Sequence, residues 1–271
     1  MRMVVHLSDI HFGSVDQTIL PPLIETVWRM EPHLVVVSGD LTQRARSSEF
    51  AEARAFLNRL PQPQLVVPGN HDVPLFNPYL RFIDKLKRFQ RYITPDLEPS
   101  YFDEEIAVLG INTARAWTWK GGRVSPSQAA RIREALCSLG PEVTRIVVTH
   151  HPFDLPQRFA DTHLVGRARM AMGYLAECGA DLLLAGHIHV SSVSSTSLRY
   201  QIAGHAALVV QAGTATSTRA RGELNSFNSL RIEAGFIEVE RWSWSRQALG
   251  FTPVLREAYD KTKNGWERRE S

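Results

Sequence analysis

Cysteine is scarce in this chain of 271 residues, which contains only Cys137 and Cys178. Both lie in helix-like runs, and neither belongs to a CxxC pair. We therefore expect neither a disulfide framework nor a cysteine zinc site. Because unpaired cysteines are typical of a reducing compartment, the sequence predicts a cytoplasmic protein.

Long apolar runs are missing as well. No segment approaches the roughly 18 uninterrupted apolar residues that indicate a transmembrane helix. The first residues, MRMVVHLSDIH, reach His6 and Asp9 too early for the apolar region of a signal peptide. Internal repeats and low-complexity segments are also absent. The sequence therefore predicts an ordinary globular protein.

Charge is nearly balanced, with 31 Lys and Arg against 28 Asp and Glu and a net charge of +3. The basic residues form short clusters at 44–46, 81–91 and 115–123. None of these is the long run typical of a nucleic-acid-binding arm. The balance fits a small anionic substrate and argues against a nucleic acid partner.

Short β-branched apolar runs alternate with helix-like segments over the first 185 residues. The predicted strands are residues 3–7, 34–38, 65–68, 107–111, 146–149 and 182–185. The predicted helices between them are residues 22–30, 48–60, 78–93, 127–139 and 167–178. Alternation of this kind is typical of an α/β protein.

The pattern changes in the last third of the chain. Residues 190–244 show strand-like alternation without a clear helix, which predicts a second sheet packed on the first. The last 16 residues, from Arg256, are polar and are expected to form a surface tail. Since no Pro/Gly/Ser-rich linker divides the chain, we expect one domain over residues 1–255 and a tail over 256–271.

Metal-ligand residue types follow nearly every predicted strand of the first 185 residues. They are, in chain order, Asp9, His11, Asp40, Asn70, His150, His187 and His189. In open α/β sheets, ligands bind at the carboxyl ends of strands, so these side chains can converge on one edge. Gly39, Gly69 and Gly186 allow tight turns directly after three of the strands.

The chemistry of this set indicates two metal ions. Oxygen and imidazole ligands without thiolate suit Mn, Fe or Zn. Seven ligands exceed what one divalent ion needs, but they suffice for two ions that share a bridging carboxylate, as in two-metal hydrolases. A single histidine after a strand would most often be an ordinary core or surface residue, whereas five such motifs in succession argue against that interpretation.

The order of the motifs resembles the signature of the calcineurin-like metallophosphoesterases, D-x-H, G-D, G-N-H-[DE], H and G-H-x-H. The matching segments are Asp9-Ile10-His11, Gly39-Asp40, Gly69-Asn70-His71-Asp72, His150 and Gly186-His187-Ile188-His189. The resemblance implies an α/β fold, a four-layer α/β/β/α sandwich of two mixed sheets flanked by helices. It also implies one metal on Asp9, His11 and His189, and another on Asn70, His150 and His187.

The same resemblance implies that Asp40 bridges the metals and that His71 faces the phosphate as a proton donor. The implied activity is hydrolysis of a phosphodiester by in-line attack of a metal-bridging hydroxide, with His71 protonating the leaving group. The size and spacing of the motifs are similar to those of the class III cyclic-nucleotide phosphodiesterases, which favours a cyclic nucleotide. Asp72 either orients His71 or caps the turn.

Three alternatives remain open. One is a lipid-linked or nucleotide-sugar pyrophosphatase, which would make peripheral contact with a membrane surface. Another is a DNA exonuclease, against which the modest charge argues. The third is a non-catalytic binding module, which would be expected to have lost ligands. The sequence does not indicate an oligomeric state.

Segment 112–126 follows a strand at the same sheet edge. Its candidate substrate-binding residues are Asn112, Arg115, Trp117 and Trp119. The segment could be a lid that stacks a base or covers an acyl chain, with cations for phosphate. The other interpretation is a surface loop whose tryptophans pack locally. His151, next to the ligand His150, is expected to be a packing or supporting residue.

Overall fold

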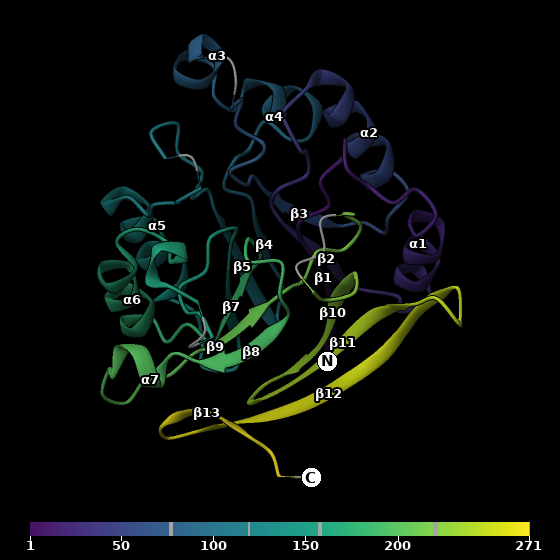
Figure 1. Ribbon diagram of the computed structural model, residues 1–271. Helices are drawn as coiled ribbons and strands as arrows, with labels where there is room; N and C mark the ends of the chain where they lie inside the picture. Colours follow the sequence, from purple (N-terminus) through teal and green to yellow (C-terminus); the bar gives the residue numbers. More distant parts are fainter. Residues whose placement is uncertain (76–77, 119, 157–158, 219–221, 271) are drawn as a thin grey trace.

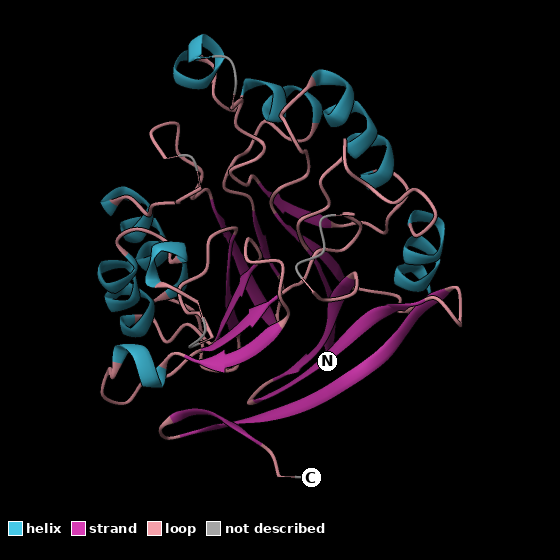
Figure 2. Ribbon diagram, viewed as in Figure 1, coloured by secondary structure: helices cyan, strands magenta, loops and turns pink. Residues whose placement is uncertain are grey.

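Two mixed β-sheets stack face to face in the computed structural model, and helices cover the outer face of each sheet (Figures 1 and 2). The structure describes residues 1–75, 78–118, 120–156, 159–218 and 222–270. The layers are therefore α/β/β/α, which confirms the fold that the motifs implied.

The first sheet has the strand order β13-β12-β11-β10-β1-β2-β3. Its strands are β1 (Arg2–Leu7), β2 (Leu34–Ser38), β3 (Gln64–Val67), β10 (Ser226–Glu233), β11 (Phe236–Ser245), β12 (Gly250–Thr262) and β13 (Gly265–Arg268). The second sheet has the order β4-β5-β6-β7-β9-β8. Its strands are β4 (Ser100–Phe102), β5 (Ile106–Ile111), β6 (Thr144–Thr149), β7 (Leu182–Ala185), β8 (Ser192–Ser195) and β9 (Leu208–Gln211).

The helices divide between the two outer faces (Figure 1). Those beside the first sheet are α1 (Leu20–Arg29), α2 (Ser47–Leu57) and α4 (Lys87–Tyr92), whereas α3 (Pro78–Ile83) lies beyond α4 at the top of the view. Those beside the second sheet are α5 (Pro126–Leu136), α6 (Ala168–Glu177) and α7 (Ser197–Tyr200). A single 3₁₀ turn, η1 (Asp161–His163), precedes α6.

Three buried clusters hold these layers together. Strand β2 shows how: Val36 joins the cluster between the sheets, while Val35 and Val37 join the cluster under α1 and α2. The third cluster lies between the second sheet and its helices and includes Leu109 and Leu175. A central strand that is buried on both faces has no polar alternation, which explains the unbroken LVVVS sequence of β2.

Parallel pairing sets the position of the site. Strands β1, β2 and β3 are mutually parallel, and so are β5, β6, β7 and β9. The carboxyl ends of each parallel set therefore lie at one edge of its sheet, as the sequence predicted.

The predicted helix over 78–93 is wrong as a single element. The chain turns at 84–86 and divides it into α3 and α4. This turn buries both Leu86 and Phe89 in the cluster under the first sheet. Burial of these two side chains explains the break better than helix propensity does.

The predictions for the C-terminal third need correction. Residues 190–244 do not build a sheet of their own, because β8 and β9 complete the second sheet while β10 and β11 extend the first. This segment also contains the short helix α7. The expected surface tail from Arg256 is wrong, since β12 continues to Thr262 and β13 follows it. Tyr259 and Trp266 anchor these strands in the core between the sheets.

The two cysteines also differ from expectation, because Cys137 and Cys178 form a disulfide. They lie at the C-caps of α5 and α6, which pack side by side. The 41-residue separation gave no sign of this contact. The argument for a reducing compartment, which assumed unpaired cysteines, therefore loses its basis. Within the described residues, no helix is long and apolar enough to cross a membrane.

Candidate metal centre

The loops that follow β1, β2, β6 and β7 meet where the edges of the two sheets come together. The Asp9 backbone N–H donates to the Gly39 carbonyl at 3.2 Å, which joins the first two loops. Among the hydrogen bonds that join the two sheets are two that involve candidate ligands. The His150 Nδ1–H donates to the Ser38 carbonyl at 2.8 Å, and the His187 N–H donates to Asp9 Oδ2 at 2.9 Å.

Backbone strain is concentrated in these loops. The structure has ten non-glycine residues with positive φ among those it describes, and five of them are predicted metal ligands. These five are Asp9, His11, Asp40, His187 and His189, with φ between 52° and 75°. Such conformations cost about 1–3 kcal/mol each and persist where the surrounding structure fixes them. The unfavourable backbone conformation at these five positions directs their side chains toward the candidate site.

The three glycines of the motifs serve two different purposes. Gly39 has a φ of 88°, a conformation that favours glycine, at a tight turn of the kind the sequence predicted. Gly69 and Gly186 provide space instead. A Cβ at Gly69 would lie 2.8 Å from Asp40 Cγ and closer still to the backbone nitrogen of Asp40. A Cβ at Gly186 would lie 2.5 Å from Asp9 Oδ2.

A first group of candidate ligands consists of Asp9, His11, Asp40 and His189, whose ligand atoms all lie within 4.8 Å of one another. His189 Nε2 is 3.2 Å from both His11 Nε2 and Asp9 Oδ1, and His11 Nε2 is 3.8 Å from Asp40 Oδ2. Four ligands bound at about 2.1 Å around a tetrahedral ion would be about 3.4 Å apart. The spacing therefore fits a metal ion.

The hydrogen bonds of Asp9 support this fit. Its Oδ2 accepts from Ser8 Oγ at 2.7 Å and from the His187 backbone N–H. Its Oδ1 is buried and meets no hydrogen-bond geometry among the described residues, although His189 Nε2, another candidate ligand, lies 3.2 Å away. A buried carboxylate oxygen without a partner is costly. A cation beside Oδ1 would remove that cost.

A second group surrounds His150. Because Nδ1 of this ring donates to Ser38, Nε2 is the ring nitrogen that faces the candidate site. This Nε2 lies 3.1 Å from Asn70 Oδ1 and 3.2 Å from Asp40 Oδ2. The His187 ring lies 5.2 Å from the His150 ring, centroid to centroid. One carboxylate oxygen of Asp40 thus faces both groups.

Burial and charge set the protonation state of these side chains in different directions. Burial lowers the pKa of His187 to about 3 and that of His11 to about 4, so both imidazoles are neutral. Burial also acts on His150, but the Asp40 carboxylate outweighs it and raises the pKa of His150 to about 9, so a metal ion that binds this ring would displace its Nε2 proton. Burial opposes ionisation of Asp40, yet the surrounding histidines hold its pKa well below the usual range. The centre concentrates negative charge that cations would neutralise.

His151 is close to the second group but is not available as a ligand. Its Nε2–H donates to the Lys120 carbonyl at 3.0 Å, and its Nδ1 accepts from Thr113 Oγ1 at 2.8 Å. Both ring nitrogens are therefore engaged with the protein. This agrees with the supporting role expected for His151.

His71 is held by two contacts beside the ligands. Its backbone N–H donates to Asp40 Oδ1 at 2.8 Å, and its Nδ1–H donates to the Gln43 carbonyl at 2.9 Å. Its ring lies edge-on to the His11 ring, with 5.0 Å between the centroids. Because Nδ1 is engaged, Nε2 is the ring nitrogen that remains for a substrate.

Asp72 holds loops together instead of contacting the His71 ring. Its carboxylate accepts from the backbone N–H groups of Leu41, Thr42 and Gly69 at 2.9–3.2 Å. Burial and the nearby Asp40 charge raise the pKa of Asp72 to about 6. Of the two interpretations that the sequence left open, these contacts fit the capping one.

A cavity of about 140 Å³ opens above the candidate ligands. It is lined by Asp40, Asn70, His71, Lys120, His163, His187 and His189. Sequence reasoning counted Lys120 among the cations of segment 112–126 without selecting it as a site residue, and it assigned no role to His163. No motif marks them, because each lies in an irregular loop that only the tertiary fold brings to the site.

The predicted substrate segment has a different arrangement. Asn112 Oδ1 accepts from the Ala114 N–H at 3.0 Å, and Arg115 donates to Gln128 Oε1 at 2.7 Å. Asn112 and Arg115 thus stabilise the loop and do not line the cavity. The Trp117 side chain is 84% exposed and lies against the Phe82 ring, 4.7 Å between centroids. Trp119 lies outside the described residues.

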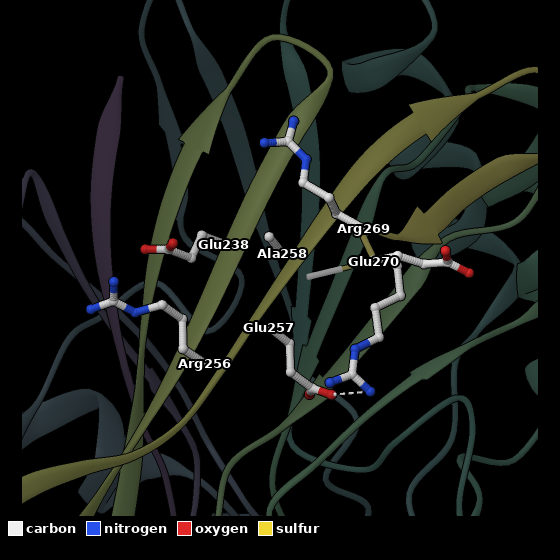
Figure 3. A pocket seen from close by; sticks show the side chains of 7 residues that line it. Glu238, Arg256, Glu257, Ala258, Arg269 and Glu270 are labelled. Carbon is white, nitrogen blue, oxygen red and sulfur yellow. Dashed lines mark ion pairs between the residues drawn. The ribbon is translucent and has the colours of Figure 1, made fainter.

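A wider cavity of about 660 Å³ lies on the outer strands β11, β12 and β13 (Figure 3). Its lining consists of Glu238, Arg256, Glu257, Ala258, Arg268, Arg269 and Glu270. Glu257 pairs with Arg268 at 3.1 Å, and acidic and basic side chains are equal in number. The lining contains no histidine and does not include the candidate ligands. The smaller cavity, which the candidate ligands line, is therefore the candidate substrate site.

Comparison with known proteins agrees with this geometry. Over 169 residues the chain is 26% identical to the glycerophosphodiester phosphodiesterase GpdQ of Enterobacter lignolyticus (strain SCF1). This alignment covers 56% of this chain and 58% of that protein. The match thus spans less than two thirds of the relative. Purple acid phosphatase PPD1 from yellow lupin (Lupinus luteus) superposes with a TM-score of 0.72 at 13% identity, over 95% of this chain and 53% of that one.

A dimetal phosphatase from Danio rerio superposes with a TM-score of 0.64 at 13% identity, over 94% of this chain and 98% of that one. At such identities the two structures support the fold alone. The family model described as calcineurin-like phosphoesterase matches residues 3–191, which include all seven candidate ligands. Because this match covers more than half of the sequence, the chain belongs to the calcineurin-like phosphoesterase family.

Proposed function

We propose that the chain is a metal-dependent phosphodiesterase that acts on a small anionic phosphodiester. The observation that carries the proposal is the position of Asp40, whose Oδ2 faces His11 of one ligand group and His150 of the other. The proposed ligands are Asp9, His11 and His189 for one ion, Asn70, His150 and His187 for the other, and Asp40 for both. Nitrogen and oxygen donors of this kind suit Mn, Fe or Zn.

Two divalent ions held there would neutralise the phosphate charge and lower the pKa of a water molecule. The chain itself contributes the proton donor. Asp40 fixes the backbone of His71, and the Gln43 carbonyl fixes its ring. We propose that His71 Nε2–H protonates the alkoxide oxygen as the bond from phosphorus to the leaving group breaks.

The size of the cavity favours a small substrate. A volume of about 140 Å³ suits a phosphate group with a short substituent better than a DNA strand. The name of the relative, glycerophosphodiester phosphodiesterase, supports a glycerophosphodiester. The motif spacing supports a cyclic nucleotide as the second candidate.

Peripheral contact with a membrane has one specific observation in its favour. Phe82, Ile83 and Trp117 are 48%, 65% and 84% exposed, and the rings of Phe82 and Trp117 pack against each other. An exposed apolar cluster of this kind can insert into a lipid interface. It supports a lipid-linked substrate as the alternative to a freely diffusing one.

One assay series tests the proposal. Protein reloaded with Mn is offered glycerophosphodiesters, cyclic nucleotides, nucleotide sugars, single-stranded DNA and bis(p-nitrophenyl) phosphate. We expect hydrolysis of small diesters, with loss of activity after chelation and in Asp40→Asn. His33→Gln, a change at an exposed histidine outside the site, serves as the control. A metal-loaded protein that cleaves none of these diesters refutes the proposal.

A further inference from the structure

The loop between β5 and α5 closes on itself beside the metal centre. The Arg123 N–H donates to the Thr113 carbonyl at 2.9 Å, which joins the two ends of the 113–123 loop. A second pair of hydrogen bonds fixes this loop to the chain before α6. The Val124 N–H donates to the Gly166 carbonyl, and the Gly166 N–H donates to the Gly122 carbonyl, at 3.0 and 2.8 Å. The loop is therefore held at both ends.

His151 connects the 113–123 loop to the ligands. Its side chain is fully buried, and its ring lies 4.9 Å from the ring of His150 and 4.6 Å from that of His187. As described above, one ring nitrogen donates to the Lys120 carbonyl and the other accepts from Thr113. The ring thus fixes the backbone of Lys120 relative to two metal ligands.

Gly122 allows this close approach. A Cβ at this position would lie 2.8 Å from His151 Cε1 and nearer still to the rest of the ring. Any larger residue would push the loop away from His151. Lys120, two residues before Gly122, lines the cavity.

Two further cations lie where this loop meets the chain before α6, Arg123 at the end of the loop and Arg167 next to Gly166. Arg123 and Arg167 are near enough to Arg115 to add to the effect of burial in lowering the pKa of Arg115, and Glu98 opposes them. Within the part of the chain that the structure describes, no ion pair joins Lys120, Arg123 or Arg167 to a carboxylate. Positive charge without a protein counter-ion beside a concave site attracts an anion.

From this geometry we propose that the Lys120 ammonium binds the anionic oxygens of the substrate phosphate, with His151 as the positioning residue. The inference rests on the proposed function and adds a substrate-binding group outside the metal-ligand motifs. A lysine suits this task because its ammonium carries three donors on a flexible stem and can follow the phosphate during the reaction.

The test replaces Lys120 by methionine, which keeps the length of the side chain and removes its charge. Lys263→Met is the matched control, because Lys263 is exposed in the turn between β12 and β13 and the net charge changes equally. Both variants and the wild type are loaded with Mn. Metal content, the kinetics of bis(p-nitrophenyl) phosphate hydrolysis and the Kd of inorganic phosphate by calorimetry are then measured.

We expect Lys120→Met to retain its metal and to raise KM and the phosphate Kd by about 10- to 100-fold, the size of a hydrogen bond to a charged group. Its kcat should change much less than its KM. Lys120→Arg should recover part of the loss, and added salt should weaken phosphate binding less in Lys120→Met than in the wild type. Values of KM and Kd equal to those of Lys263→Met overturn the inference.

Thr113→Val tests the role of His151, because it removes the hydroxyl that donates to the ring. If His151 acts by placing Lys120, Thr113→Val alone raises KM. Added to Lys120→Met, the same substitution causes no further rise in KM. An equal rise in both backgrounds refutes the positioning role. A wild type that cleaves no diester would refute the proposed function, whereas the phosphate Kd would still decide the role of Lys120.

Discussion

Replacing Gly69 by alanine adds one methyl group at the most crowded point of the centre. The new Cβ would lie 2.8 Å from Asp40 Cγ, where ordinary contact begins at 3.4 Å, and its contact with the Asp40 backbone is tighter. The loop that carries Asp40 must therefore move by about 0.6 Å or more, which takes the carboxylate away from both ligand groups. Overpacking of this kind destabilises a protein by about 1–3 kcal/mol.

For a chain of this size, each kcal/mol of lost folding stability lowers Tm by about 2–4 °C. We also expect Gly69→Ala to bind fewer metal ions than the wild type. Thermal unfolding of the metal-free protein and metal analysis after reloading with Mn measure the two effects separately. The separation matters because bound metal would itself raise Tm.

Gly173→Ala is the matched control, since it is the same substitution in α6 with nothing within 4 Å of the new Cβ. At a position inside a helix, alanine is more favourable than glycine by about 0.8–1 kcal/mol. This variant should therefore be more stable than the wild type and should bind metal normally. Opposite changes in Tm are thus expected from one chemical change. A Gly69→Ala protein with wild-type Tm and full metal content would refute the packing argument.

Three further predictions address the chemistry. Metal analysis should approach two Mn ions per chain, and saturation at one ion would contradict the assignment of two ligand groups around Asp40. His71→Ala should keep its metal and lose about 10²- to 10⁴-fold in kcat, with a smaller loss for a nitrophenolate leaving group that hardly needs a proton; loss of metal would show that His71 is a ligand. Trp117→Ala should weaken sedimentation with anionic liposomes and leave hydrolysis of bis(p-nitrophenyl) phosphate unchanged, and equal sedimentation of variant and wild type would argue against membrane contact.

The strained loops explain why the ligand motifs are short and local. Asp9 and His11 both have left-handed φ, and so do His187 and His189. Each pair occupies one turn directly after a strand, so two ligands are directed by a few residues of chain. Such turns depend on the sheet beneath them, because an isolated segment would relax to a less costly backbone.

Features that depend on neighbouring residues could be predicted from the sequence. Apolar runs such as LVVVS located the central strands within a residue or two, since the burial of both faces leaves no polar alternation. Ligand-type residues directly after these strands indicated where the metal centre would form. The order of the motifs was enough to indicate the family, whereas the assignment of each ligand to one ion remains a prediction.

Features that depend on distant residues became visible only in the folded chain. Strand β10 pairs with β1, with Met3 opposite Arg231, and so joins the first sheet instead of forming a new one. The Cys137–Cys178 disulfide and the place of Lys120 at the cavity likewise depend on helices and loops that meet in space. No local pattern records such contacts, because their free energy comes from surfaces that are buried only when the whole chain has folded.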